Sequence, residues 1–186
     1  ALAVRGAAPI TEAVLANAPA LRVIGRTGVG YDSIDIAAAT RRGIPVVYAP
    51  GAGAPAVAEA TFAFMLALCK QVMHWDRELK AGNWNSRLGV QGGDLDGKVI
   101  GIIGLGRIGR LVAGIAKVFN MTVMATDPYV DAATCAAHSA LKVELEELLS
   151  TADFISLHCP QNAETRGMIN RARLASVKPG AFLVNL

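Results

Sequence analysis

Three glycines at a fixed spacing give the clearest chemical signal in the chain. Gly104, Gly106 and Gly109 follow the apolar run 99–103 in the order G-x-G-x-x-G. In this motif the first glycine allows a tight turn, the second lets the backbone approach a pyrophosphate, and the third lets a helix pack on the strand. Apolar side chains recur at helical spacing from Ile108 to Phe119, so the N–H groups of the first helical turn would face the phosphates. This pattern predicts dinucleotide binding.

An acidic residue stands where such a site needs one. Asp127 ends a second predicted strand, residues 122–126, and follows Gly109 by 18 positions. A carboxylate there accepts hydrogen bonds from the adenine ribose and repels a 2′-phosphate, which favours NAD over NADP. The alternative is a purely structural glycine turn followed by a turn at Asp127 and Pro128. The order of strand, glycines, amphipathic helix, strand and acid favours the nucleotide.

Strands and helices alternate along the chain and would position these residues. Strands are predicted at 21–24, 44–48, 98–103, 122–126, 153–158 and 181–186, with helices at 35–42, 57–79, 108–119 and 144–150. Such alternation indicates an α/β fold with a parallel, doubly wound sheet. The Gly, Ala and Pro-rich stretch 49–56 suggests a domain boundary. We therefore expect one domain over residues 1–50 and a nucleotide-binding domain over 51–186.

Composition narrows the class of protein. With 186 residues, 53% of them hydrophobic, the chain can bury a core, and a formal charge of +3 without a basic run gives no sign of a nucleic-acid partner. The apolar run 62–69 is far shorter than the roughly 18 residues of a membrane span. Cys69, Cys135 and Cys159 form no C-x-x-C pair, so we expect no metal site and a cytoplasmic protein. No signal peptide is evident, and the lack of an initiator Met leaves a leader open.

Five stretches of the chain are distinctive when they are taken together: "TGVGYDSIDIAAATRRGIPVVYAPGAGAPAVAEATFAFMLAL", "LDGKVIGIIGLGRIGR", "TDPYV", "LEELLSTADFISLHCPQNAETRGMIN" and "LASVKPGAFLVNL". In this order they resemble the D-isomer-specific 2-hydroxyacid dehydrogenases, particularly their phosphoglycerate dehydrogenase branch. The resemblance implies a Rossmann-type NAD-binding domain, incomplete here, preceded by part of a flavodoxin-like substrate domain. It also implies a fragment truncated at both ends.

The resemblance assigns cofactor contacts to individual positions. It places Arg107 and Ile108 at the pyrophosphate, with Cys159, Pro160 and Leu186 as further cofactor-binding residues. A metal or nucleophile role for His158 with Cys159 is disfavoured, because neighbouring residues on a strand point to opposite faces.

The resemblance also assigns a substrate site. The loop at Gly28, Val29 and Gly30 would offer backbone N–H groups to the substrate carboxylate, although a plain strand-to-helix turn is the alternative. Arg5 and Arg26 match arginines of the phosphoglycerate branch and suit a phosphate, although both could be solvated surface residues. The substrate is therefore expected to be 3-phosphoglycerate, as in serine biosynthesis, with glyoxylate, hydroxypyruvate and lactate-type acids still open.

Hydride transfer in the family uses an Arg, a Glu and a His. Val184, Asn185 and Leu186 begin the motif that contains the arginine, so the catalytic residues are expected beyond the end of the chain. The three histidines, His74, His138 and His158, are expected to be surface or packing residues. The chain would then bind NAD without turnover. A corepressor-like NAD-binding module and a structural partner without nucleotide binding are the alternatives.

The resemblance further implies a homodimer or homotetramer at full length. Helix 57–79, with Phe62, Met65, Leu66 and Cys69 at helical spacing, would contribute to the dimer or else form ordinary core.

Overall fold

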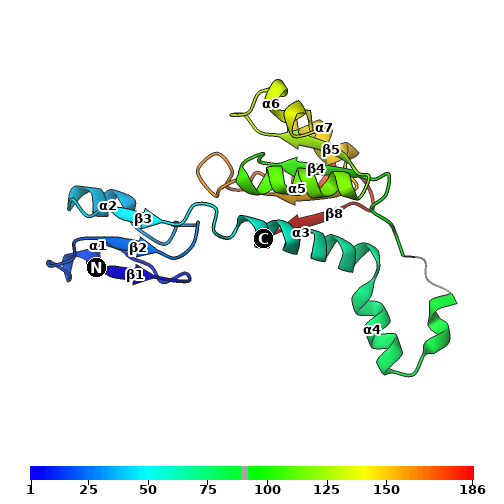
Figure 1. Cartoon of the computed structure of the whole chain (residues 1–186), viewed down its shortest axis with the longest axis horizontal. Coiled ribbons are helices and arrows are strands. Elements are labelled where there is room, and N and C mark those ends of the chain that lie inside the picture. Colours follow the sequence, from blue (N-terminus) through cyan, green and yellow to red (C-terminus); the bar gives the residue numbers. More distant parts are fainter. Residues whose placement is uncertain (89–91) are drawn as a thin grey trace. The chain divides into compact units, whose positions relative to one another are not determined.

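The computed structural model describes residues 1–88 and 92–186, which form two compact units, Ala1–Ala54 and Pro55–Leu186 (Figure 1). Each unit has its own parallel sheet and its own buried core. The α/β class predicted from the alternating pattern is confirmed.

The first unit is a three-stranded parallel sheet in the order β1-β2-β3. Its elements are β1 (Leu2–Val4), α1 (Glu12–Ala16), β2 (Ile24–Arg26), α2 (Ile36–Arg41) and β3 (Val46–Tyr48). Asp35 caps α2 by accepting a hydrogen bond from the Ala38 N–H at 2.8 Å, and Gly43 follows the helix with a φ of 63°. The strand predicted at 21–24 was misplaced, because only Ile24 of that run pairs with its neighbours.

The second unit is a five-stranded parallel sheet in the order β6-β5-β4-β7-β8. Its strands are β4 (Val99–Ile103), β5 (Thr122–Thr126), β6 (Leu141–Lys142), β7 (Phe154–Leu157) and β8 (Phe182–Asn185). Because β4 lies between β5 and β7, the chain reverses its direction of progress across the sheet beside β4. Dinucleotides bind at such a switch point, at the carboxyl ends of the strands.

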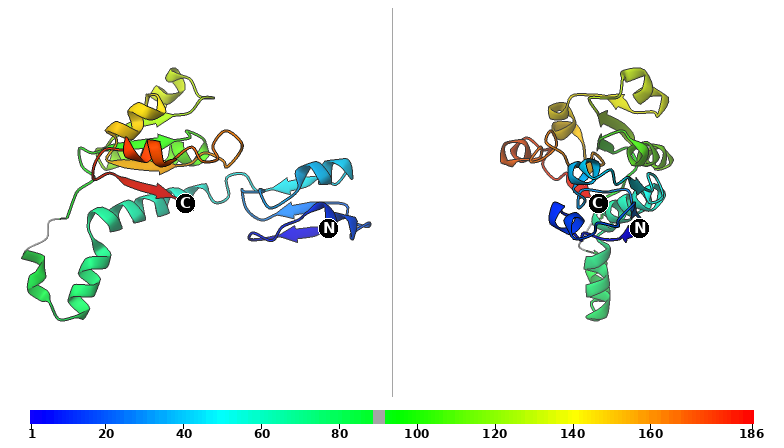
Figure 2. Two further views of the ribbon diagram at one scale, coloured as in Figure 1. Left: turned by 180° about the vertical axis from the view of Figure 1, so that it is seen from behind. Right: turned by 90° about the vertical axis from the view of Figure 1, so that its left-hand side faces the viewer.

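Helices cover both faces of this sheet (Figures 1 and 2). Phe62 and Met65 of α3 (Ala54–Cys69) and Val112 of α5 (Arg107–Val118) pack in one core with Ile100 and Ile102. A second core on the other face joins α7 (Leu145–Thr151) to alternate residues of the same strands. The sheet is doubly wound, as predicted.

The helix predicted over 57–79 is wrong as a single element. It is two helices, α3 and α4 (Val72–Lys80), which meet at an angle of 57°. Gln71 adopts a left-handed φ of 53°, and the Cys69 carbonyl accepts the Gly93 N–H at 2.7 Å. In a continuous helix the Cys69 carbonyl would accept the Met73 N–H instead. A contact with a residue distant in the sequence therefore ends α3.

Six further elements were not predicted from the sequence pattern: strands β1 and β6, helices α1, α6 (Ala132–Ala137) and α8 (Arg171–Ala175), and the 3₁₀ turn Trp84–Leu88. Within the described residues, no single helix has the length and apolar character to cross a membrane; only the bent pair α3 and α4 meets both criteria together.

Candidate functional site: a dinucleotide-binding edge

Two of the three motif glycines are held in place by packing. Gly104 has a φ of 95°, and a Cβ on it would lie 2.7 Å from the Cys159 nitrogen. A Cβ on Gly109 would strike the Gly104 carbonyl and lie 3.2 Å from a methyl group of Ile102. The turn and the seating of α5 on β4 therefore require glycine at both positions.

Gly106 is different, because a Cβ there would meet no protein atom within 4 Å. It is the N-cap residue of α5, a helix of 12 residues, and no side chain caps that helix. Among the described residues, the N–H groups of Gly106, Arg107 and Ile108 have no recorded acceptor. Open space beside unpaired donors at a helix N-terminus fits the pyrophosphate of a dinucleotide.

Asp127 fixes the glycine loop. Its Oδ2 accepts the Leu105 N–H at 2.9 Å, and its Oδ1 accepts the Tyr129 N–H at the same distance. Leu105 is fully buried. Each carboxylate oxygen can accept a further bond, so the arrangement leaves acceptors for ribose hydroxyls. No cation among the described residues forms an ion pair with Asp127.

The loop after β7 lies against the glycine loop. The His158 N–H donates to the Ile103 carbonyl at 2.8 Å, and its side chain shares a 2.8 Å hydrogen bond between Nε2 and the buried Ser156 Oγ. Burial lowers the pKa of His158 to about 4 and raises the pKa of the Cys159 thiol. Near neutral pH both groups are therefore uncharged, which does not suit a thiolate and base pair.

A contact that the sequence did not suggest lies at the same edge. The Tyr129 hydroxyl, two residues beyond Asp127, donates to Glu164 Oε2 at 2.7 Å. The bond joins the loop after β5 to the loop after β7 and raises the pKa of Tyr129. The partners are 35 positions apart, and neither belongs to the glycine motif, so no local pattern connects them.

The other expected cofactor residues lie near the ends of their elements. Arg107 is exposed at the start of α5, and Leu186 follows β8 with half its surface exposed. Pro160 is exposed, and its carbonyl accepts the Thr165 hydroxyl at 2.6 Å.

The three histidines lack carboxylate partners in the described part of the chain. His74 packs edge-on against Trp75 in α4, and its buried Nε2 has no hydrogen-bond partner there. His138 is the C-cap residue of α6. Within the same residues, no group of three metal-binding side chains is close enough to hold an ion.

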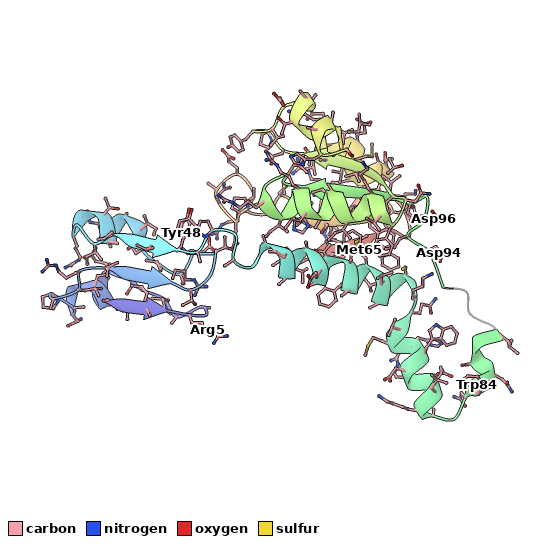
Figure 3. All side chains as sticks on the ribbon, in the orientation of Figure 1. Arg5, Tyr48, Met65, Trp84, Asp94 and Asp96 are labelled. Carbon is pink, nitrogen blue, oxygen red and sulfur yellow. The ribbon has the colours of Figure 1, made fainter. Side chains whose placement is uncertain are left out.

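The expected substrate loop of the first unit follows β2. The N–H groups of Gly28, Val29 and Gly30 have no recorded acceptor among the described residues. Arg26, just before the loop, donates from Nε to the Gly30 carbonyl at 2.6 Å and from Nη1 to the Gly6 carbonyl at 2.8 Å. The side chain of Arg5 points away from the ribbon (Figure 3) and has no recorded partner in the described residues.

Comparison with known proteins agrees with this geometry. Residues 62–186 match the family model described as D-isomer specific 2-hydroxyacid dehydrogenase, NAD binding domain. The chain belongs to the D-isomer-specific 2-hydroxyacid dehydrogenase family. The region matched is its NAD-binding domain, so NAD is the cofactor of this domain.

Named relatives place the chain more closely within the 2-hydroxyacid dehydrogenases. It is 43% identical to D-3-phosphoglycerate dehydrogenase of Mycobacterium leprae over 185 residues, covering 100% of the chain and 35% of the relative. Identity is 42% to the Methanocaldococcus jannaschii protein of the same name, over 99% of the chain and 35% of the relative. The chain thus spans about a third of the length of these relatives.

A solved structure shows the same fold. D-lactate dehydrogenase from Aquifex aeolicus, in complex with NAD and lactic acid, superposes with a TM-score of 0.88 at 34% identity. The match covers 95% of this chain and 53% of that one.

Proposed function

We propose that the protein carrying these residues is an NAD-dependent oxidoreductase acting on the CH–OH group of a D-2-hydroxy acid. The observation that carries the proposal is the uncapped start of α5, where Gly106 leaves open space beside unpaired N–H groups. Bound there, NAD supplies a nicotinamide that accepts a hydride from the alcohol carbon. The chain's own contribution is to hold the pyrophosphate on α5 and the ribose on Asp127.

The proposed substrate is D-3-phosphoglycerate. Support comes from relatives of that name at 43% and 42% identity. In the first unit, the loop N–H groups of residues 28–30 would bind the carboxylate, and the phosphate would need a cation, for which the sequence offers Arg5 and Arg26. Residues 1–50 would then belong to the substrate domain and 51–186 to the NAD-binding domain.

Exchanging Asp127 for asparagine tests the cofactor half of the proposal. Asp127→Asn removes the charge and keeps one oxygen acceptor. We expect the affinity for NADH to fall about tenfold, which corresponds to roughly 1.4 kcal/mol, and the affinity for NADPH to fall less, because its 2′-phosphate is no longer repelled. Titration calorimetry measures both affinities.

Asp131→Asn is the matched control for this experiment. Asp131 lies on the same loop, but its Oδ1 accepts the Thr134 N–H at 2.7 Å and caps α6. NADH affinity in this control should equal that of the wild type. An unchanged NADH affinity in Asp127→Asn would rule out the ribose role.

Substrate preference tests the proposed reaction and substrate. The natural polypeptide that carries this chain is assayed for NAD reduction with D-3-phosphoglycerate, D-glycerate and D-lactate, and for NADH oxidation with glyoxylate and hydroxypyruvate. We expect the highest kcat/KM with D-3-phosphoglycerate. A preference for an unphosphorylated acid would contradict the phosphate assignment, and no reaction with any of these acids would contradict the oxidoreductase.

We also propose that the protein forms homodimers or homotetramers through α3. Phe64 and Leu68 are 50% and 43% exposed on the side of α3 away from the core that Phe62 and Met65 enter. An exposed apolar stripe of this kind is typical of an interface.

A further inference from the structure

We propose that Arg26 is a positioning residue that holds the substrate loop in its binding shape, and that it does not bind the substrate phosphate. The inference rests on the proposed function, because it gives that loop the role of binding a carboxylate. It separates Arg26 from Arg5, although the two arginines look equivalent in the sequence.

The guanidinium group of Arg26 already donates hydrogen bonds within the first unit. Nε donates to the Gly30 carbonyl and Nη1 to the Gly6 carbonyl, at 2.6 and 2.8 Å. Both are charge-assisted hydrogen bonds at the short end of the usual range. Only Nη2 has no recorded acceptor among the described residues, and it lies 3.8 Å from the place of a Cβ on Gly28. A phosphate that bound the edge formed by Nε and Nη2 would break the bond to Gly30, which leaves only the second N–H of Nη1 and those of Nη2 for another acceptor.

The two carbonyls belong to loops that follow adjacent parallel strands. Gly6 comes after β1, and Gly30 comes after β2, so both lie at the carboxyl edge of the sheet. Gly6 has a φ of 75°, which places its peptide in a turn that few other residues adopt. The guanidinium therefore joins the two turns, beside a longer hydrogen bond of 3.4 Å from the Thr27 hydroxyl to the Val4 carbonyl at the end of β1.

Orientation of the peptide planes links these bonds to anion binding. In a trans peptide the C=O and the following N–H point in opposite directions. When the Gly30 carbonyl points at Arg26, the Tyr31 N–H must point away from it, toward the exposed side of the loop. The N–H groups of residues 28–31 have no recorded acceptor in the described chain, and Val29 is 47% exposed. Arg26 thus presents backbone donors to a ligand while its own charge lies behind the loop.

Arg5 is the residue left for the phosphate. It is exposed, has no recorded bond within the described residues and points away from the sheet (Figure 3). Its guanidinium can offer two parallel donors to a phosphate, the geometry that arginine provides best.

Nuclear magnetic resonance of the whole 186-residue chain separates the two roles. The variants are Arg26→Gln, Arg26→Lys and Arg5→Gln, with Arg22→Gln as the matched control, since Arg22 is an exposed arginine just before β2. Backbone ¹⁵N relaxation without ligand reports the order of residues 28–31. Titrations with D-glycerate and D-3-phosphoglycerate, followed at the same amides, report affinity.

The ligand-free measurement tests the positioning role by itself. We expect the heteronuclear NOE of residues 28–31 to fall in Arg26→Gln and in Arg26→Lys, because one ammonium group cannot span the two carbonyls. Wild-type values should persist in Arg5→Gln and Arg22→Gln. Unchanged values in both Arg26 variants would overturn the inference, and the lysine variant keeps the positive charge if the glutamine variant fails to fold.

The titrations distinguish positioning from phosphate binding. We expect Arg26→Gln to weaken both ligands by about the same factor, roughly tenfold, because a less ordered loop is binding-competent for a smaller fraction of the time. Arg5→Gln should weaken only D-3-phosphoglycerate. Loss of D-3-phosphoglycerate alone in Arg26→Gln would make Arg26 a phosphate ligand and overturn the inference. If wild-type loop amides respond to neither acid, the proposed substrate role of the loop fails, and that result is seen before any variant is compared.

Discussion

Gly104 and Gly106 stand two residues apart but face different constraints. Gly104 is enclosed by the backbone of residues 158 and 159, whereas a Cβ on Gly106 would enter space that the protein does not fill. The fold requires the first glycine, and only a bound dinucleotide would require the second.

Alanine substitutions test this separation. Gly104→Ala should lower the free energy of unfolding by more than about 1 kcal/mol, because of its positive φ and the close backbone contact. Gly106→Ala should keep wild-type stability within about 0.5 kcal/mol and reduce NADH affinity about tenfold or more. Urea unfolding and calorimetric titration give the two quantities. Equal destabilisation by both substitutions would contradict the distinction.

His158 makes stability depend on pH in a defined window. Its pKa is lowered to about 4 in the folded protein by burial, against an ordinary value of 6.5. Between these values the unfolded chain binds a proton that the folded chain does not, so stability falls as the pH falls from 6.5 to about 4. Above 6.5 the imidazole is neutral in both states, and below about 4 both states are protonated.

The expected loss across this window is up to about 3 kcal/mol. Urea unfolding at a series of pH values measures it, and His158→Gln should flatten the profile between pH 6.5 and 4. His138→Gln, at the end of α6, is the matched control and should leave the slope in place. A wild-type slope retained in His158→Gln would assign the titration to another group.

Asp153 joins strands at their amino-terminal ends, whereas the glycine loop lies at their carboxyl ends. Its Oδ2 accepts the Val99 N–H at 2.9 Å, and its Oδ1 accepts from Lys178 Nζ at 2.8 Å. Its backbone carbonyl accepts the Phe182 N–H at the start of β8. Burial raises the pKa of Asp153, but the bonds from Lys178 and Val99 outweigh burial and hold the pKa below its ordinary 3.8. Asp153, directly before β7, thus connects to β4 through its side chain and to β8 through its backbone.

Removing this carboxylate should cost about 2 kcal/mol in Asp153→Ala, because the Val99 N–H loses its acceptor. Lys178→Met keeps that acceptor and should cost less, about 1 kcal/mol at most, since the ion pair is partly exposed. The contribution of the Asp153 carboxylate to stability is full above its ordinary pKa and is lost as the pH falls through its lowered pKa. This loss therefore occurs at lower pH than the loss caused by His158. Urea unfolding of both variants at neutral and acid pH measures these losses. A larger loss of stability in Lys178→Met than in Asp153→Ala would show that the ion pair, and not the bond to Val99, is the main contribution.

Exposed apolar residues on α3 lead to a prediction about assembly. If Phe64 and Leu68 form an interface, the wild-type chain should elute at twice its 19.4 kDa mass or more. Phe64→Glu should shift it to the monomer mass, because a buried unpaired charge is costly. Val118→Glu, at an 84% exposed position of α5, is the control and should not change the mass. Light scattering coupled to size exclusion gives the mass, and a monomeric wild type would contradict the proposal.

The sequence predicted those parts of the molecule that depend on local order. Gly104, Gly106, Gly109 and Asp127 lie within 24 residues, so their spacing alone placed them around one turn at the end of β4. The alternating strands and helices likewise gave the doubly wound sheet.

Features that depend on distant contacts could not be predicted in this way. The break after α3 depends on the Gly93 N–H reaching Cys69, and no Gly or Pro marks it. The partners of Arg26 include Gly6, 20 positions away, and Tyr129 meets Glu164 across 35 positions. Local patterns describe which residues share an element, whereas these contacts depend on how elements come together.

The open space at Gly106 has a consequence for natural variation. Mutations at Gly104 or Gly109 lower the amount of folded protein, so selection for abundance alone would remove them. An alanine at position 106 would not be removed by selection for abundance. It would be removed only where dinucleotide binding matters to the organism. Two deep mutational scans, one scored for cellular abundance and one for growth that needs the enzyme, should therefore disagree most at this position within the glycine loop.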